Sequence, residues 1–219
     1  MTHSAGRAAG AAGRREERKA ENRSKLLAAA LTVFAEKGLG AATARDIVRE
    51  TDLATGTFYN YFRDKEDAFR ALLDESTERI RAAARQVRLN LDLTLEQRVE
   101  LGFLTYFEMA LENRDLFEVF RRNSGVIASD QNLFEPAIGE LVEDLREWAA
   151  AGDIPPLGLD YLAAATGGLS FQVATHLIGR DPPDVQGATA FCTRFFLGGV
   201  RALAEAAAGK TTATAEAAG

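Results

Sequence analysis

The stretch "ATGTFYNYFRDKED", residues 54–67, decides the fold of this chain. Its first nine residues hold four aromatic side chains and a glycine, and a charged run follows. Phe58 and Phe62 are spaced i, i+4, so a short helix buries both rings on one face. Tyr59 and Asn60 are then left facing outward or sideways. The sequence therefore predicts a short helix with an apolar anchor and a polar, aromatic surface.

The neighbouring segments predict a helix on each side of this one. Thr43 and Asp46 form a capping-box pattern at the start of a helix over about 44–50. "TDLA", residues 51–54, makes the turn, and Asp64 is the N-cap of a long helix from Lys65 to about Leu89. Two short helices joined by a tight turn form a helix-turn-helix, whose second helix lies in the DNA major groove. Such pairs also occur in bundles that never bind DNA, in which case Tyr59 is packed and Asn60 caps or is solvated.

Helical periodicity continues along the rest of the chain. Further helices are expected at about 23–37, 94–112, 115–122, 132–151, 159–178 and 185–207. The segments 150–158 and 179–184 are breakers, and "NSGVIASDQN", residues 123–132, interrupts the pattern and is expected to rim an entrance. The fold class is all-α with about nine helices. Four regions are predicted: a flexible basic tail over 1–22, a helix-turn-helix domain over 23–70, a helical domain for ligand binding and dimerisation over 71–207, and a flexible tail over 208–219.

Composition narrows the class of protein. The chain has 219 residues and is 47% hydrophobic, which suits one large domain or two modest ones. No run of eighteen apolar residues is present, so a membrane partner is not expected. The single cysteine, Cys192, cannot form an intramolecular disulfide. The expected protein is soluble and cytoplasmic.

Charge is unevenly distributed between the two ends. Residues 1–70 carry 13 Lys+Arg and 10 Asp+Glu, whereas the remaining residues carry 13 and 22. A basic N-terminal part and an acidic remainder are typical of a chain with two functions, the first of which involves a polyanion. The alternative is an ordinary random scatter of surface charge. The basic tail up to Lys25 either adds a flexible minor-groove or phosphate contact or is inert.

"TARDIVRETDLATGTFYNYFRDKEDAF", residues 43–69, resembles the N-terminal domain of the TetR family of transcriptional repressors. The similarity extends back through "RSKLLAAALTVFAEKG" and covers about residues 23–70. It implies that the start of the second helix contacts DNA phosphate and that the recognition helix contacts bases and the DNA backbone. It also implies that the lysine of the next helix contacts phosphate. With Arg45 added because it lies beside the helix start, the expected DNA-binding residues are Thr43, Ala44, Arg45, Thr55, Gly56, Thr57, Tyr59, Asn60, Tyr61 and Lys65.

Three residues depart from the family's common choices. Asp52 stands where a turn glycine is frequent, and Asp tolerates the left-handed conformation. Thr55 stands where Lys or Arg is frequent, so one phosphate or guanine contact is open. Tyr61 stands where His is frequent, and its hydroxyl retains a donor for phosphate. The preferred base sequence is therefore open.

The resemblance also implies a homodimer through the last two long helices. Mid-helix glycines cost about 0.5–1 kcal/mol relative to Ala, and close helix–helix approach is the expected compensation. Packing within one subunit is the alternative. The expected interface residues are Ala164, Gly168, Phe195, Gly198 and Gly199.

A small-molecule site is expected among the middle helices, because ligand sites are mostly apolar with a few polar groups. The candidate residues are Phe103, Phe107, Phe117, Phe120, Trp148, Phe171, Gln172 and His176, and each aromatic ring among them has plain core packing as its alternative.

No catalytic constellation, cofactor motif or metal-ligand spacing occurs, so an enzyme is not expected. The predicted function is a repressor that binds a palindromic double-stranded DNA operator as a dimer and is released by a small hydrophobic or amphipathic ligand. A regulator without an effector, or an activator, is the alternative.

Overall fold

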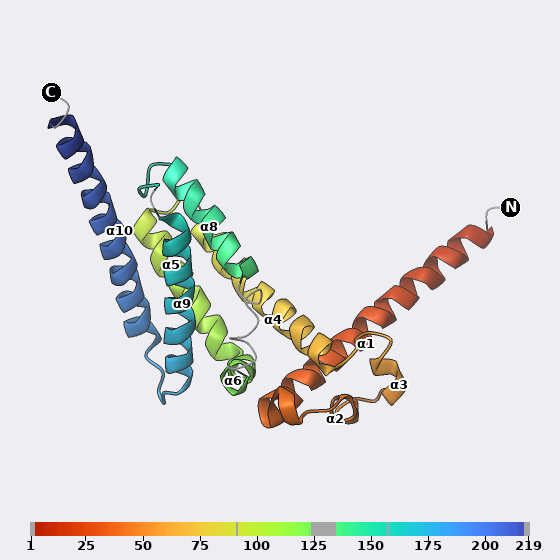
Figure 1. Cartoon of the computed structure of the whole chain (residues 1–219). Helices are drawn as coiled ribbons and strands as arrows, with labels where there is room; N and C mark the ends of the chain where they lie inside the picture. Colours follow the sequence, from red (N-terminus) through yellow and green to blue (C-terminus); the bar gives the residue numbers. More distant parts are fainter. Residues whose placement is uncertain (1–2, 91, 124–134, 157, 217–219) are drawn as a thin grey trace. The chain divides into compact units, whose positions relative to one another are not determined.

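The computed structural model describes residues 3–90, 92–123, 135–156 and 158–216, and the side chains of these residues except 3–12, 76 and 207–216. Within these ranges the secondary structure is helical, with nine helices and no strand, which confirms the all-α class (Figure 1). The helices are α1 (His3–Ala41), α2 (Ala44–Arg49), α3 (Thr55–Phe58), α4 (Lys65–Arg88), α5 (Leu95–Glu112), α6 (Arg114–Arg122), α8 (Glu135–Ala150), α9 (Leu159–Ile178) and α10 (Val185–Glu216).

Two compact units make up the chain. The first contains residues 1–76 and 115–129, and the second contains residues 77–114 and 130–219. The division falls inside α4, whereas the sequence places it at residue 70. It also assigns α6 to the first unit, where Arg122 Nη1 donates to the carbonyl of Glu36 near the end of α1 at 2.8 Å.

The first unit is built around α1. Leu26, Ala30 and Phe34 recur at helical spacing and have no exposed surface, so this face of α1 forms the core. The ring of Phe34 meets that of Phe69 on α4 edge to face, with centroids 5.3 Å apart. Ile47 from α2 is also fully buried, so α1, α2 and α4 share one apolar interior.

A glycine and a pair of capping residues set the helix ends before α2. Gly38 has φ 72° and ψ 161°, a conformation that breaks α1 and favours glycine. Thr43 and Asp46 form the predicted capping box at the start of α2. The recognition helix is shorter than expected, since α3 ends at Phe58 and residues 59–61 form a turn.

Both chain ends are more helical than expected. The segment 3–22, predicted as a flexible tail, is part of α1, and residues 208–216 are part of α10. Ala, Arg, Glu and Lys dominate the first segment, and their high helix propensity accounts for its conformation. Its side chains from 13 to 21 are exposed. Of the predicted entrance rim, residues 124–132 lie outside the described residues.

The second unit is a helical bundle. Helix α5 packs against α9 and α10, and α8 packs against α9. Trp148 on α8 is 3% exposed, and its ring meets Phe196 of α10 edge to face with centroids 6.2 Å apart. Asp144 is 1% exposed and accepts from Arg85 at 2.8 Å and from Arg88 at 2.9 Å. These two guanidiniums offset the cost of burying the carboxylate. Among the described helices, none is long and apolar enough to cross a membrane.

Candidate nucleic-acid interface

The recognition segment presents the predicted face. Phe58 and Phe62 are 0% and 4% exposed and their centroids are 5.5 Å apart, so they anchor the segment. Tyr59 is 60% exposed, and its ring meets that of Phe58 edge to face with centroids 5.4 Å apart. Asn60 is also exposed, as are Thr55 and Gly56 at the start of α3. Hydroxyl and amide groups of this kind can bind phosphate oxygens and base edges.

Two predicted contact residues are less accessible. Thr57 and Tyr61 are half-buried, and the ring of Tyr61 lies against that of Phe62 with centroids 6.5 Å apart. Part of each side chain is still accessible to solvent. Both can still reach a ligand that lies along the domain surface.

The donors of Thr43 are occupied by a carboxylate. Its backbone N–H donates to Asp46 Oδ2 at 3.0 Å and its hydroxyl donates to the same oxygen at 2.6 Å. The Thr43 hydroxyl and the Lys37 ammonium, 2.9 Å from Oδ1, lower the pKa of Asp46 to about 2. Thr43 itself is exposed and Ala44 is half-buried. A phosphate contact from Thr43 would have to displace a bond to Asp46.

Arginines on α2 supply free positive charge beside the recognition segment. Arg45 and Arg49 are one turn apart and exposed, and neither has an acidic partner among the described side chains. Arg45 was predicted from the sequence and Arg49 was not, although the two are spaced i, i+4 on one helix. Together they form a cationic edge suited to a DNA backbone.

Lys65 does not present the free ammonium that was expected. Its Nζ donates to the carbonyls of Leu39 at 2.8 Å, Gly40 at 3.1 Å and Ala42 at 3.0 Å. These carbonyls follow the break at Gly38, where the α1 pattern no longer satisfies them. All three donors of the ammonium are used, so Lys65 joins the start of α4 to the α1–α2 connection. A phosphate contact from this side chain would break at least one of these bonds.

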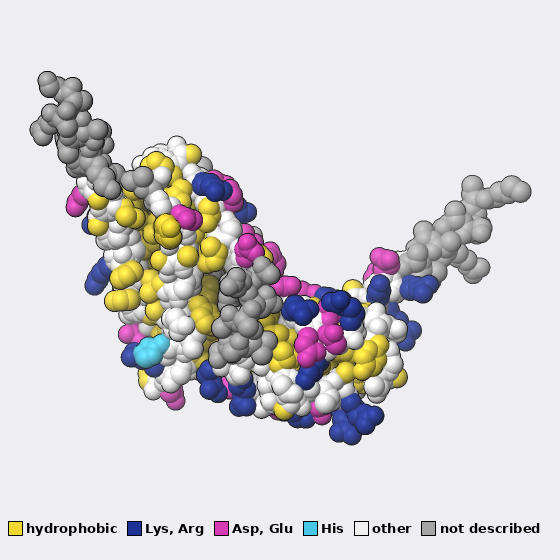
Figure 2. All heavy atoms as spheres, viewed as in Figure 1, with side chains coloured by type: hydrophobic (Ala, Val, Ile, Leu, Met, Phe, Trp, Pro, Cys, Tyr) yellow, Lys and Arg dark blue, Asp and Glu magenta, His cyan; other side chains and the backbone are white. Residues whose placement is uncertain are grey.

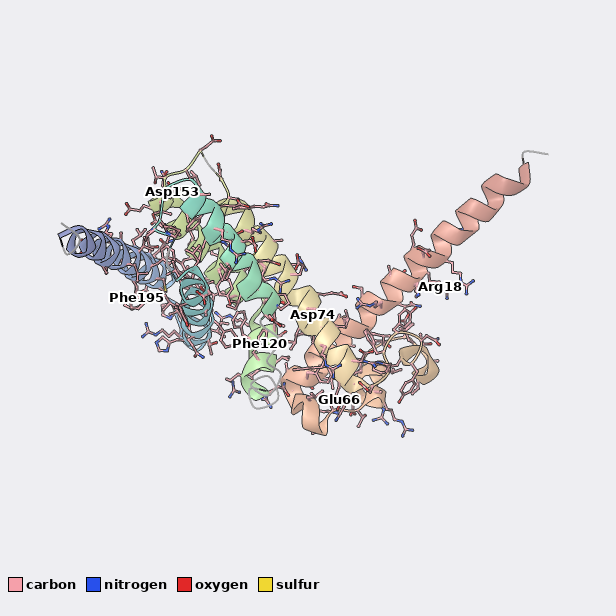
Figure 3. The ribbon with its side chains drawn as sticks, turned by 45° about the horizontal axis from the view of Figure 1, so that its top comes forward. Arg18, Glu66, Asp74, Phe120, Asp153 and Phe195 are labelled. Atoms are coloured by element: carbon pink, nitrogen blue, oxygen red, sulfur yellow. The ribbon has the colours of Figure 1, made fainter. Side chains whose placement is uncertain are left out.

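The predicted ligand residues are divided between the two units. Phe103, Phe107 and Trp148 are buried in the second unit, whereas Phe117 and Phe120 are buried in the first. Figure 3 labels Phe120 on α6. Phe171 is half-buried on α9. The aromatic candidates in the second unit fit its core equally well.

Gln172 and His176 are exposed in the single chain and do not line its interior. The reason is their spacing, because they follow Ala164 and Gly168 at intervals of four residues on α9. They therefore belong to the same outer face as the predicted dimer residues.

Other polar groups lie inside the second unit. Arg98 on α5 is 3% exposed, donates to Asp153 through Nη2 and has its guanidinium carbon 5.3 Å from the Trp148 ring centre. Its Nε and Nη1, and the hydroxyls of Thr189 and Thr193 on α10, are buried with no hydrogen-bond partner among the described groups. Burial also raises the pKa of Tyr106. Arg98 was missed because it lies in the first turn of α5, where a charged residue usually faces water.

The predicted dimer residues form an exposed face, here called the α9–α10 face. It comprises Ala164 and Gly168 of α9 and Phe195, Gly198 and Gly199 of α10, all exposed in the single chain. Phe195 is 62% exposed and stacks on Phe191, which is 57% exposed, with centroids 6.0 Å apart. Figure 2 shows hydrophobic side chains gathered over α9 and α10, and Figure 3 labels Phe195.

The space around each glycine distinguishes packing within the chain from packing against a second copy. A Cβ on Gly167 would lie 2.6 Å from Cδ1 of Ile138, so Gly167 serves packing of α9 on α8 within the chain. A Cβ on Gly168, Gly198 or Gly199 would have no described atom within 4 Å. Packing inside the chain therefore does not account for the last three.

Comparison with known proteins gives a family match over the first unit. Residues 26–72 match the model described as "Bacterial regulatory proteins, tetR family". The HTH-type transcriptional repressor KstR2 of Mycolicibacterium smegmatis is 30% identical over 129 residues, which span 59% of this chain and 62% of that protein. An uncharacterized HTH-type transcriptional regulator of Bacillus subtilis, YdgC, is 31% identical over 45% of this chain and 52% of its own length. The chain thus spans between half and two thirds of these two relatives.

Solved structures share the fold over more of the chain. The fatty acid degradation regulator FadR of Bacillus halodurans has a TM-score of 0.69 and 22% identity, covering 82% of this chain and 96% of that one. FadR of Bacillus subtilis, solved in complex with stearoyl-CoA, has a TM-score of 0.68 and 19% identity, covering 81% and 98%. At these identities the likeness concerns the fold. Among the described residues, no group of His, Cys, Asp and Glu could hold a metal ion.

Proposed function

The chain belongs to the TetR family of bacterial regulatory proteins, and from this premise we propose that it is a cytoplasmic repressor that binds a palindromic DNA operator as a homodimer. A small amphipathic ligand in the second unit would release it. It would act by binding and not by turnover. The observation that carries the proposal is the exposed Tyr59 and Asn60 on a segment anchored by the buried Phe58 and Phe62.

The recognition segment and the α2 arginines would divide the work of binding. Tyr59, Asn60 and Thr55 would meet base edges and nearby backbone, because they are the exposed hydrogen-bonding groups of this segment. Arg45 and Arg49 would meet phosphates, since each is exposed and has no acidic partner among the described side chains. Lys65 would act indirectly, by holding the α1–α2 connection.

A dimer follows from the α9–α10 face. Its glycines leave space that no described atom of this chain fills, and its stacked Phe191 and Phe195 are more than half exposed. A second copy would bury both features. Two recognition segments would then read half-sites spaced by one helical turn, about 34–36 Å, or a multiple of it.

The effector site is proposed inside the second unit. Its rings supply an apolar interior, and Arg98, Thr189 and Thr193 supply unpartnered polar atoms there. An amphipathic molecule with an acidic or carbonyl head group suits both features. FadR of Bacillus subtilis, which shares the fold, was solved in complex with a molecule of this kind, stearoyl-CoA. Coupling between effector and operator would be about 1–3 kcal/mol.

Selection from random DNA tests the proposal. Duplexes retained by the purified protein would be sequenced, and affinity for the enriched duplex would be measured by fluorescence anisotropy. We expect an inverted repeat, and titration with acyl-CoA thioesters of several chain lengths is expected to weaken binding. Enrichment of no sequence would refute the operator. If these ligands did not weaken binding to the enriched site, the protein would be a regulator with another effector or with none. If the protein activated a reporter gene placed behind that site, it would be an activator and not a repressor.

A further inference from the structure

The part of α1 that precedes its buried face carries segregated charge. Its described side chains include Arg14, Arg15, Arg18 and Lys19, here called the basic face, and all four are exposed. None has an acidic partner among the described side chains. Figure 3 labels Arg18 on the stretch of α1 that extends past α2, α3 and α4 of the same unit.

Helical spacing puts these four cations on one side. At about 100° per residue they occupy an arc of about 140°. Glu16, Glu17 and Glu21 occupy the opposite arc. An ordinary solvated helix would intersperse the two signs, often as i, i+4 pairs. The separation gives α1 one cationic side and one anionic side.

The cationic side overlaps the side of α1 that packs on the rest of the first unit. Lys19 and Leu26 are seven residues apart and so share a side of α1, and Leu26 is fully buried in the first unit. Arg18 and Lys25 are also seven apart, and Lys25 lies 3.5 Å from Asp52 in the turn before α3. Arg15 and Lys19 thus continue the inward side of α1 beyond the last residues that the unit buries, and Arg14 and Arg18 lie along its edge, on the side that Lys25 shares.

From Leu26 back to Arg14 the helix extends about 18 Å, the length of about five base pairs. A partner of the basic face must therefore be a polyanion that runs alongside the helix-turn-helix and past it. Duplex DNA has this shape and charge. We propose that the basic face binds the phosphate backbone of the DNA that flanks each operator half-site; this rests on the proposed function.

A charge-neutral variant tests the assignment. Arg14→Gln/Arg15→Gln/Arg18→Gln/Lys19→Gln removes the four charges and keeps polar side chains of similar helix propensity. Its matched control, Glu16→Gln/Glu17→Gln, neutralises the opposite side. Each would be titrated by fluorescence anisotropy with two duplexes selected by the wild-type protein, one ending at the half-sites and one extended by ten base pairs at each end, over a series of salt concentrations.

On the extended duplex we expect the fourfold variant to bind at least about tenfold more weakly, and its salt slope to fall by at least about two, at ~0.9 for each phosphate that is no longer neutralised. On the short duplex the loss of affinity should be much smaller, and sequence preference should not change. The control should bind as wild type or more tightly. Circular dichroism would establish that each variant keeps its helical content.

Equal affinity and salt slope for wild type and the fourfold variant on the extended duplex would overturn the proposal while leaving operator binding intact. Capture of wild type, but not the variant, by vesicles of anionic lipid, with unchanged DNA binding, would overturn it in favour of a lipid surface. If no sequence were selected, the proposed function would have failed instead, and the two failures are thus distinguishable.

Discussion

Asn123, just after α6, accepts a hydrogen bond from the backbone N–H of Leu39 through Oδ1 at 2.7 Å. Its Nδ2 donates to the carbonyl of Val119, also at 2.7 Å. The carbonyl of Leu39 is meanwhile held by Lys65 at 2.8 Å. The peptide groups on both sides of Leu39 are therefore fixed by two other helices, α6 and α4. Only three residues separate Leu39 from Thr43, the N-cap of α2.

Asn123→Ala should destabilise the first unit. Asn123 and Leu39 are 4% and 5% exposed, so the substitution leaves a buried N–H without an acceptor. The expected loss is about 1–3 kcal/mol in the free energy of unfolding, measured by urea denaturation. Asn113→Ala is the matched control, because Asn113, at the end of α5, also donates to a carbonyl one turn earlier, at 2.6 Å. Among the described residues, no N–H of another segment donates to its side chain. Equal losses for the two variants would refute the role of the Leu39 bond.

Lys65→Met should lower stability without altering the salt dependence of DNA binding. The substitution keeps the aliphatic stem and removes three bonds to carbonyls, with an expected cost of about 1–3 kcal/mol. Lys37→Met is the control, since Lys37 has one carboxylate partner at the surface and should cost under about 1 kcal/mol. A salt slope reduced by about one unit in Lys65→Met would instead identify a phosphate contact.

Local sequence rules account for much of the fold. The i, i+4 spacing of Phe58 and Phe62 predicted their burial, and both are core residues. The capping box at Thr43 and the break at Gly38 were readable because each depends on residues within one turn. The exposure of Tyr59 and Asn60 then followed, since a helix with one face buried leaves the other free.

Hydrogen-bond and packing partners that are distant in the sequence could not be predicted. The carbonyls that hold Lys65 are more than twenty residues away, so a cation that looked free is occupied. The exposure of Gln172 was not predicted, because α9 carries apolar residues of its own on most of its faces. The sequence alone does not say which of these faces packs against a neighbouring helix. Arg98 could not be recognised as buried before the positions of Trp148 and Asp153 were known.

The stability of the first unit should depend on pH through Asp46. Its pKa is lowered from 3.8 to about 2 by the Thr43 hydroxyl and Lys37. A lowered pKa means that the ionised form stabilises the fold at pH values above about 4, and that this contribution is lost as pH falls toward 2. The free energy of unfolding should fall over that window.

Asp46→Asn isolates this group from other carboxylates. Glu118, whose pKa is lowered from 4.5 to about 2 by Arg121 and Arg122, contributes in the same direction. The difference in unfolding free energy between wild type and Asp46→Asn should be constant from pH 5 to 7 and should shrink between about pH 4 and 2. A difference that stayed constant down to pH 2 would contradict the lowered pKa.

Tyr59→Ala should strongly weaken specific operator binding and leave the fold intact. The side chain is 60% exposed, so its removal should change the unfolding free energy by about 0.5 kcal/mol or less. Loss of a base or backbone contact should cost about 1–3 kcal/mol in binding per subunit, measured by gel shift with the selected duplex. Tyr59→Phe distinguishes the hydroxyl from the ring. Unchanged affinity in Tyr59→Ala would remove this residue from the interface.

Phe195→Glu should dissociate the dimer. It puts a charge in the centre of the α9–α10 face, where stacked Phe191 and Phe195 would be desolvated by a second copy. A loss of at least about 2 kcal/mol corresponds to a rise of about thirtyfold in the dimer dissociation constant, measured by sedimentation velocity. Leu101→Glu is the control, because Leu101 is an apolar residue on α5 that is 38% exposed and lies outside this face. Since two half-sites need two subunits, Phe195→Glu should also weaken operator binding, whereas a variant that stays dimeric would place the interface elsewhere.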